Sequence, residues 1–131
     1  MIKLTIYMEP VGKARARTVR RGAKIITYTP DKTTHAENLI RDKVMDIGEK
    51  FDHGTPIQVT ATFYRTRPKS VKAKVLYPTS RPDIDNFMKL LLDSLEGFAY
   101  DNDSQITTVL CKKRFGAPPR IELMIQEEKE L

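Results

Sequence analysis

The sequence DIDNFMKLLLDSL, residues 83–95, decides the fold of this chain. Its apolar side chains recur at positions i, i+3, i+4, i+7 and i+11, which places them in one stripe of an α-helix. The members of this stripe are Ile84, Phe87, Met88, Leu91 and Leu95. Asp83 stands where an acidic residue favours the helix dipole, and Gly97 is expected to end the helix. The stretch predicts an amphipathic helix from Ile84 to Leu95 that packs on a sheet.

Alternating apolar residues before this helix predict strands of that sheet. Residues 2–9 and residues 57–64 both alternate, and the second run is rich in β-branched side chains. Between them, Thr29-Pro30-Asp31 has the order of a helix start, with a hydroxyl at the N-cap, proline at the first helical position and an acid in the first turn. We expect a helix over about residues 30–50. Its apolar stripe consists of Ala36, Ile40, Val44, Ile47 and Phe51.

Three further β-prone runs complete the predicted order. Residues 24–28 are expected to pair with the first strand as a hairpin. Residues 104–115 and 120–126 are separated by Gly116-Ala117-Pro118-Pro119, a turn sequence that predicts a second hairpin. The resulting order is ββαβαββ in a single domain, residues 1–131. This order is typical of an α+β fold with a mixed, mostly antiparallel sheet and two helices packed against it.

Two basic connections account for much of the positive charge of this chain, whose net charge is +6. We expect residues 12–22 to form a cationic loop with glycine at both ends, and residues 66–82 to form a longer one that leads directly into Asp83. Long loops in compact domains usually have a function, and cations attract phosphate backbones, although a solvated surface is the simpler interpretation. The predicted DNA contacts are Lys13, Arg15, Arg17, Arg20, Arg21, Lys69, Lys72, Lys74 and Arg81.

Carboxylates gather at the start of the 83–95 helix and in the turn that follows it. Asp83 and Asp85 flank the first helical position, and Asp103, with Asp101 as the alternative, precedes the next strand. Three converging carboxylates raise one another's pKa unless a cation lies between them, and Mg²⁺ prefers such oxygen ligands. The pattern indicates a magnesium site of Asp83, Asp85 and Asp103, although acids at a helix start also occur for capping alone.

Lys89 lies one helical turn after Asp85 on the same face. Its ammonium group could offset negative charge on a phosphate bound near the metal. The simpler interpretation is an Asp85–Lys89 ion pair on the helix surface, which contributes about 0.3–0.5 kcal/mol. The spacing alone favours the ion pair.

The rest of the composition excludes several classes of protein. No apolar run approaches the roughly 20 residues of a membrane-spanning helix, and no secretory signal is visible, so we expect a cytoplasmic protein with no membrane partner. Cys111 is the single cysteine and the two histidines are isolated in sequence, so there is no pattern of a disulfide or a structural zinc site.

The sequence RPDIDN (residues 81–86), followed by Lys89, DSL (residues 93–95), Gly97 and DNDSQ (residues 101–105), resembles the signature of the RusA family of Holliday junction resolvases. More weakly, the resemblance extends over residues 1–126. It implies a homodimeric endodeoxyribonuclease, common in phage and prophage genomes, that binds four-way DNA junctions and nicks two strands symmetrically with Mg²⁺. Mn²⁺ is expected to substitute for Mg²⁺, and no small-molecule substrate is implied.

The same resemblance assigns roles by position. Asp83, Asp85 and Asp103 match the catalytic, metal-binding aspartates of the family, and Lys89 matches its catalytic lysine, which reverses the preference for an ion pair. The connection from Leu95 to Asp103 is one residue shorter than in the best-known member. The choice between Asp101 and Asp103 therefore stays open at this point.

Two other functions compete with the nuclease on the residues alone. One is a non-catalytic nucleic-acid-binding module, in which the basic segments bind the backbone and the acids cap a helix. The other is a different metal-dependent phosphotransfer enzyme. The Asp-x-Asp pair of phosphatases usually follows a buried strand, whereas here the polar sequence PTSRP (residues 78–82) precedes it.

Overall fold

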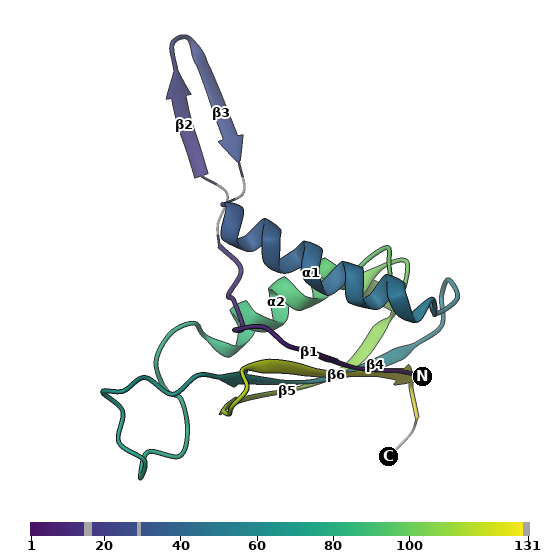
Figure 1. Ribbon diagram of the computed structural model, residues 1–131. Coiled ribbons are helices and arrows are strands. Elements are labelled where there is room, and N and C mark those ends of the chain that lie inside the picture. The colour runs from purple at the N-terminus through teal and green to yellow at the C-terminus, as the bar shows by residue number, and fades with distance from the viewer. Residues whose placement is uncertain (15–16, 29, 130–131) are drawn as a thin grey trace.

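The computed structural model describes residues 1–14, 17–28 and 30–129. Two helices lie on one face of a four-stranded sheet, and a two-stranded hairpin projects beyond them (Figure 1). The elements in chain order are β1 (Ile2–Ile6), β2 (Arg17–Arg21), β3 (Lys24–Tyr28), α1 (Asp31–Ile47), β4 (Ile57–Arg65), α2 (Ile84–Leu95), the 3-10 helix η1 (Asp103–Gln105), β5 (Ile106–Phe115) and β6 (Arg120–Glu127). The predicted α+β class is confirmed, with one strand more than expected. None of the helices in the described ranges is long and apolar enough to cross a membrane.

The four-stranded sheet has the order β1-β6-β4-β5. Strand β6 is antiparallel to both of its neighbours, β1 and β4, whereas β4 and β5 are parallel. A parallel pair needs a crossover connection, and α2 supplies it between β4 and β5. The start of α2 is therefore reached directly from the end of β4 through residues 66–83.

The helices bury the apolar faces that their sequences predict. Helix α2 spans the expected residues, and its Phe87 ring stacks on Phe63 of β4 with ring centroids 5.1 Å apart. Ile84 departs from the predicted stripe, because 41% of this residue is exposed, and Leu90 is buried instead. The exposed Ile84 leaves the very start of α2 outside the core.

Helix α1 differs slightly from the expected boundaries. It ends at Ile47 rather than near residue 50, because Gly48 adopts a left-handed conformation with φ of 73° that ends the helix. Pro30 occupies the N-cap position without a side-chain capping bond, and the predicted cap Thr29 lies outside the described residues. The buried face includes Glu37 beside Ala36 and Ile40, so a carboxylate lies within the apolar stripe.

The predicted pairing of residues 24–28 with the first strand is wrong. Strand β3 pairs with β2, and both strands stand apart from the main sheet. The turn between them has only two residues, and its first, Gly22, has a φ of 61°, a conformation that tight hairpin turns favour. Part of the expected basic loop is thus a strand of a projecting hairpin (Figure 1).

The predicted hairpin between the last two strands is also wrong, because β4 lies between β5 and β6. Strands that flank a third lie about 10 Å apart, and the four residues 116–119 reach about 13 Å, so they can cross over the end of β4. Gly116 makes this crossing possible, since a Cβ atom there would lie 2.6 Å from Cδ1 of Tyr64.

Candidate active site

The start of α2 presents three charged side chains to solvent. Asp83, Asp85 and Lys89 are all exposed, and among the described residues none of them belongs to an ion pair. Asp83 stands at the N-cap, where its carbonyl oxygen accepts the amides of Asn86 and Phe87, but its side chain makes no capping bond. Neither capping by Asp83 nor an Asp85–Lys89 ion pair therefore accounts for these residues.

Side chains of strands β4 and β5 hold the backbone that precedes Asp83. Lys113 of β5 donates from its ammonium group to the carbonyl oxygens of Ser80 and Pro82, at 2.9 and 3.0 Å. Arg65 at the end of β4 donates to the carbonyl and hydroxyl oxygens of Ser80, at 3.3 and 3.2 Å. Sequence reasoning missed Lys113. Lys113 is the register partner of the core residue Phe63 on the neighbouring strand, a position where an apolar side chain is expected. A cation at such a position indicates a specific role.

The segment after β1 holds the backbone on both sides of Asp83 and Asp85, at Pro82 and Asn86. A Cβ atom at Gly12 would lie 2.8 Å from Cβ of Pro82, so only glycine allows this close approach. The backbone amide of Lys13 donates to the carbonyl oxygen of Asn86 at 3.1 Å. Asp83 and Asp85 thus lie on a stretch of backbone held by two separate parts of the chain.

Asp103 lies near the opposite end of α2. The hydroxyl of Tyr100 donates to Oδ1 of Asp103 at 2.7 Å and lies 3.1 Å from the carbonyl oxygen of Leu92. Burial raises the pKa of Asp103, the Tyr100 hydrogen bond partly offsets this, and the carboxylates of Glu96 and Asp93 raise it further. Burial and the same contact with Asp103 raise the pKa of Tyr100 well above its usual range. Tyr100 therefore stays a hydrogen-bond donor at neutral pH.

Asp101, the alternative third carboxylate, is already engaged. Its oxygens lie 2.6 Å from the ammonium of Lys50 and 3.3 Å from Nδ1 of His53. The hydrogen bond from Lys50 lowers the pKa of Asp101. The side chain of Gln105 accepts the amides of Asp101 and Asn102 at 3.0 and 3.1 Å and so fixes the turn. Both carboxylate oxygens of Asp101 thus have a basic partner, whereas Oδ1 of Asp103 accepts the Tyr100 hydroxyl.

Within one chain the three predicted aspartates do not form a metal-holding group. Across the described residues, no three His, Cys, Asp or Glu side chains are placed to hold an ion together. The Tyr100 hydroxyl contacts both Asp103 and the carbonyl of Leu92, so Asp103 lies near Leu92. Leu92 follows Asp85 by seven residues, which is about 10 Å along the helix axis. Asp83 and Asp85 by themselves fit Mg²⁺, which commonly binds one or two carboxylates and leaves its other positions to water and phosphate.

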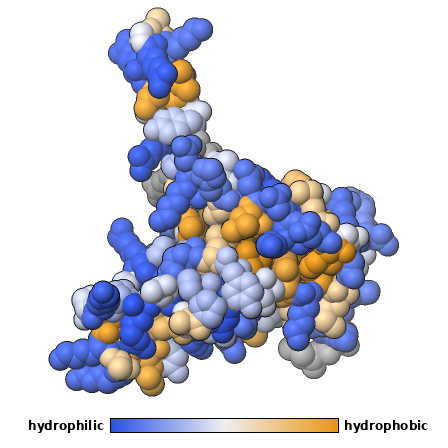
Figure 2. Space-filling view, in the orientation of Figure 1, coloured by the Kyte–Doolittle hydropathy of each residue, from blue (hydrophilic) through white to orange (hydrophobic). Residues whose placement is uncertain are grey.

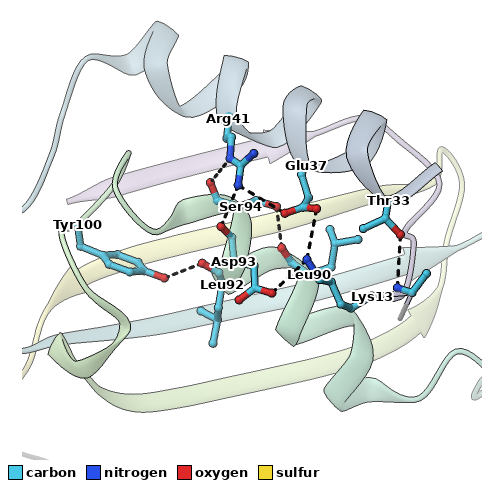
Figure 3. Close-up of polar contacts among 10 residues, drawn as sticks. Lys13, Thr33, Glu37, Arg41, Leu90, Leu92, Asp93, Ser94 and Tyr100 are labelled. Atoms are coloured by element: carbon cyan, nitrogen blue, oxygen red, sulfur yellow. Dashed lines mark hydrogen bonds and ion pairs between the residues drawn. The ribbon is translucent and has the colours of Figure 1, made fainter. Parts of the chain in front are cut away.

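Lys13, a predicted DNA contact, belongs to a half-buried polar network between α1 and α2 (Figure 3). Its ammonium lies 3.2 Å from Asp93 and 3.4 Å from Glu37. Arg41 lies 3.4 Å from the second oxygen of Glu37 and donates to the carbonyl oxygens of Asp93 and Ser94 at 3.2 Å each. Lys13 thus connects the base of the hairpin to both helices.

The other predicted DNA contacts lie on two arms. Arg17, Arg20 and Arg21 are exposed on β2, and Arg15 lies outside the described residues. The residues of the 66–82 segment, Lys69, Lys72, Lys74 and Arg81, are exposed as well. The hairpin also carries apolar side chains beside its cations, as Figure 2 shows, and Ile25 is 73% exposed. The start of α2 lies between the bases of these two arms (Figure 1).

A small α+β domain with an exposed carboxylate pair between two cationic arms is typical of metal-dependent enzymes that act on nucleic-acid phosphates. Residues 8–126 match the family model for the endodeoxyribonuclease RusA, and the chain belongs to this family. The chain is 32% identical over 136 residues to the uncharacterized protein YqaN of Bacillus subtilis (strain 168), with 96% of each chain covered. It is 38% identical over 80 residues to the crossover junction endodeoxyribonuclease rusA of Lactococcus phage r1t, with 60% of each covered.

Proposed function

We propose that this RusA-family endodeoxyribonuclease resolves four-way DNA junctions by paired, symmetric nicks that require Mg²⁺. The observation that carries the proposal is the set of three exposed charges at the start of α2, Asp83, Asp85 and Lys89, which form no ion pair with any described residue. Charges that are largely buried normally have partners, as those of Lys13 and Glu37 do. Unpaired charges held on a fixed backbone are suited to bind a metal and a phosphate.

Each residue has a role in this proposal. Asp83 and Asp85 hold the metal, Asp103 is the third carboxylate, and Lys89 offsets the negative charge that develops on the phosphate. Bound Mg²⁺, for which Mn²⁺ can substitute, activates a water molecule and stabilises charge on the phosphate oxygens. Lys113 is a positioning residue, because it holds the carbonyl groups on both sides of Arg81.

The arms supply the attraction for DNA. The described residues of the hairpin and of the 66–82 segment include cations and no acid, and they flank the start of α2 on two sides (Figure 1). Contacts with phosphates position a protein on nucleic acid without reading its sequence. The arms therefore provide binding and orientation, whereas the start of α2 provides the chemistry.

The test uses a mobile four-way junction labelled on each strand in turn and incubated with and without Mg²⁺. Paired nicks at symmetric positions are expected only with Mg²⁺. Asp85→Asn is expected to reduce nicking more than about a hundredfold, since loss of even a second-shell partner of a metal costs 10–100-fold. Junction binding by this variant should be kept or tightened, because a negative charge near DNA is removed.

Asp42→Asn is the matched control, because Asp42 is an exposed aspartate on α1. It should nick like the wild-type protein. Undiminished nicking by Asp85→Asn would contradict the assignment of the site. Junction binding by the wild-type protein without any metal-dependent nicking would instead support a non-catalytic binding module.

A homodimer belongs to the same proposal. A four-way junction has approximate two-fold symmetry, and two coordinated nicks need two related sites. Bringing Asp103 to Asp83 and Asp85 requires either a shift of the turn at residues 101–105 or a second copy of the chain. Sedimentation velocity at micromolar concentration without DNA should show a species of two chains, and monomers alone would count against it.

A further inference from the structure

A cationic groove lies directly beside the carboxylate pair. It has a volume of about 390 Å³ and runs between the base of the β2–β3 hairpin, the first turn of α1 and the stretch that leads into α2. Its lining includes Arg17 and Lys32 together with Arg81, Pro82 and Asn86. Pro82 and Asn86 are the immediate neighbours of Asp83 and Asp85, so the groove opens beside the proposed site.

The charges of the groove are of one sign. Lys13, Arg17, Lys32 and Arg81 line it, and no acidic residue is among the described residues that do so. The ammonium of Lys13 is engaged by Asp93 and Glu37. Arg17, Lys32 and Arg81 are exposed and form no ion pair with any residue of the described ranges. Three exposed cations that line one groove favour an anion within it.

The groove is also part of the rigid frame of the site. Its floor contains the contact between Gly12 and Pro82 and the 3.1 Å bond from the amide of Lys13 to the carbonyl of Asn86. The amide of Ala14 donates to the hydroxyl of Thr33 at 3.4 Å and connects the hairpin base to α1. The contacts that hold the backbone around Asp83 and Asp85 are therefore also part of the groove.

We propose that this groove binds the sugar-phosphate backbone of the DNA strand that is cut, at a phosphate close to the scissile one, with Lys32 and Arg81 as the principal contacts. The inference rests on the proposed nuclease function and deepens it. Lys32 is a residue that the sequence pattern did not mark, because it stands alone among polar residues of α1 and only the fold brings it to the same groove as Arg81. A strand held here presents its next phosphates to the carboxylate pair.

The test measures binding of a four-way junction without divalent metal over a range of salt concentrations. Lys32→Gln and Arg81→Gln should each weaken binding about eightfold at 0.1 M salt and lower the slope of log K against log salt by about one, as expected for loss of one phosphate contact. Lys43→Gln removes the same charge from an exposed position further along α1 and should change neither quantity. Thermal unfolding followed by circular dichroism verifies that the variants are folded.

A second measurement locates the phosphate. Single methylphosphonate linkages, which are uncharged, are placed one at a time along the cut strand of the junction. One position near the nick should weaken binding of the wild-type protein and have no further effect on the Lys32→Gln, Arg81→Gln double variant. The inference is overturned if both single variants bind like Lys43→Gln, or if the double variant keeps the wild-type response at every position.

The two failures can be told apart. If the wild-type protein nicks the junction with Mg²⁺ but the groove variants bind like the control, the groove is wrong and the nuclease stands. If the groove variants lose affinity and salt slope while the wild-type protein never nicks, the groove stands as a DNA-binding site and the proposed catalysis is wrong.

Discussion

The charged side chains at the two ends of helix α2 have opposite environments. At the N-terminal end, Asp83, Asp85 and Lys89 are exposed and have no ion-pair partner among the described residues. At the C-terminal end, Asp93 lies 3.2 Å from Lys13, and Asp103 accepts the Tyr100 hydroxyl at 2.7 Å. One end of the same helix therefore leaves its charges available, and the other uses them within the fold.

This difference follows from what each end packs against. The C-terminal half packs against α1, where burying a charge without a partner is costly. Lys13 is the partner of Asp93, and Tyr100 is the partner of Asp103. The N-terminal end lies between the bases of the two arms, where water can solvate its charges at little cost. Solvated charges on a rigid backbone are free to bind a ligand, which paired charges are not.

Asp103 is the strongest test of this comparison, because a residue at the paired end is proposed to act in catalysis. Asp103→Asn should reduce metal-dependent nicking more than about a hundredfold, like Asp85→Asn. The variant should also be more stable than the wild-type protein near pH 7. The pKa of Asp103 is raised in the folded state, so ionisation above the ordinary pKa of 3.8 destabilises the fold, and asparagine removes this ionisation while it can still accept the Tyr100 hydroxyl.

The sign of this effect sets its pH dependence. Below pH 3.8 the wild-type carboxyl is protonated in both states, so the two proteins should have the same free energy of unfolding in urea, and the difference should grow as the pH rises. Lower stability of Asp103→Asn near neutral pH, or normal nicking by this variant, would contradict a catalytic role and show that Asp103 contributes only to the fold.

Lys89 gives the next largest expected effect. Lys89→Gln should lower the nicking rate about a hundredfold to a thousandfold, as loss of one group that stabilises transition-state charge does. Its free energy of unfolding should stay within about 0.5 kcal/mol of the wild-type value, because the side chain is exposed and has no ion pair with the described residues. Single-turnover nicking and urea unfolding measure the two quantities. A large loss of stability with normal nicking would show that Lys89 belongs to the fold instead.

Glu37 should show the reverse pattern. Glu37→Gln leaves Lys13 and Arg41 facing each other without the carboxylate between them and should lower the free energy of unfolding by about 1–3 kcal/mol. Nicking by the folded variant should stay within about threefold of wild type, since Glu37 does not touch the proposed site. Glu49→Gln is the matched control, because its only ion pair among the described residues is with the half-exposed N-terminal amine. An equal effect of both substitutions would contradict the importance of the network.

Asp101 should give the smallest effect. Asp101→Asn removes surface contacts with Lys50 and His53 and should leave nicking at the wild-type rate. Because the pKa of Asp101 is lowered in the folded state, its contribution to stability is present above the ordinary pKa of 3.8 and is lost as the pH falls further. Loss of nicking in Asp101→Asn, with normal nicking in Asp103→Asn, would exchange the roles of the two residues.

Much of the fold follows from local patterns. The stripe of Phe87, Met88 and Leu91 predicts α2 with its observed ends, since a helix of this kind is fixed by its own periodicity and by Gly97 after it. Strand pairing was less predictable. A turn sequence such as residues 116–119 predicts adjacent strands, and nothing local indicates that β4 lies between them. The pairing of β3 with β2 could not be predicted, because the basic sequence of β2 does not have the apolar alternation of a half-buried strand.

The sequence by itself determined the two helices, the class of fold and the residue types of the proposed site at Asp83, Asp85 and Lys89, because these depend on spacing within a few neighbouring residues. Only the tertiary structure decided which charges are engaged and which are available. Lys13, Lys32, Arg81 and Lys113 are all cations in the sequence, yet one joins two helices, one holds a loop and two line one groove. Their partners are distant in the chain, and no local pattern encodes such contacts.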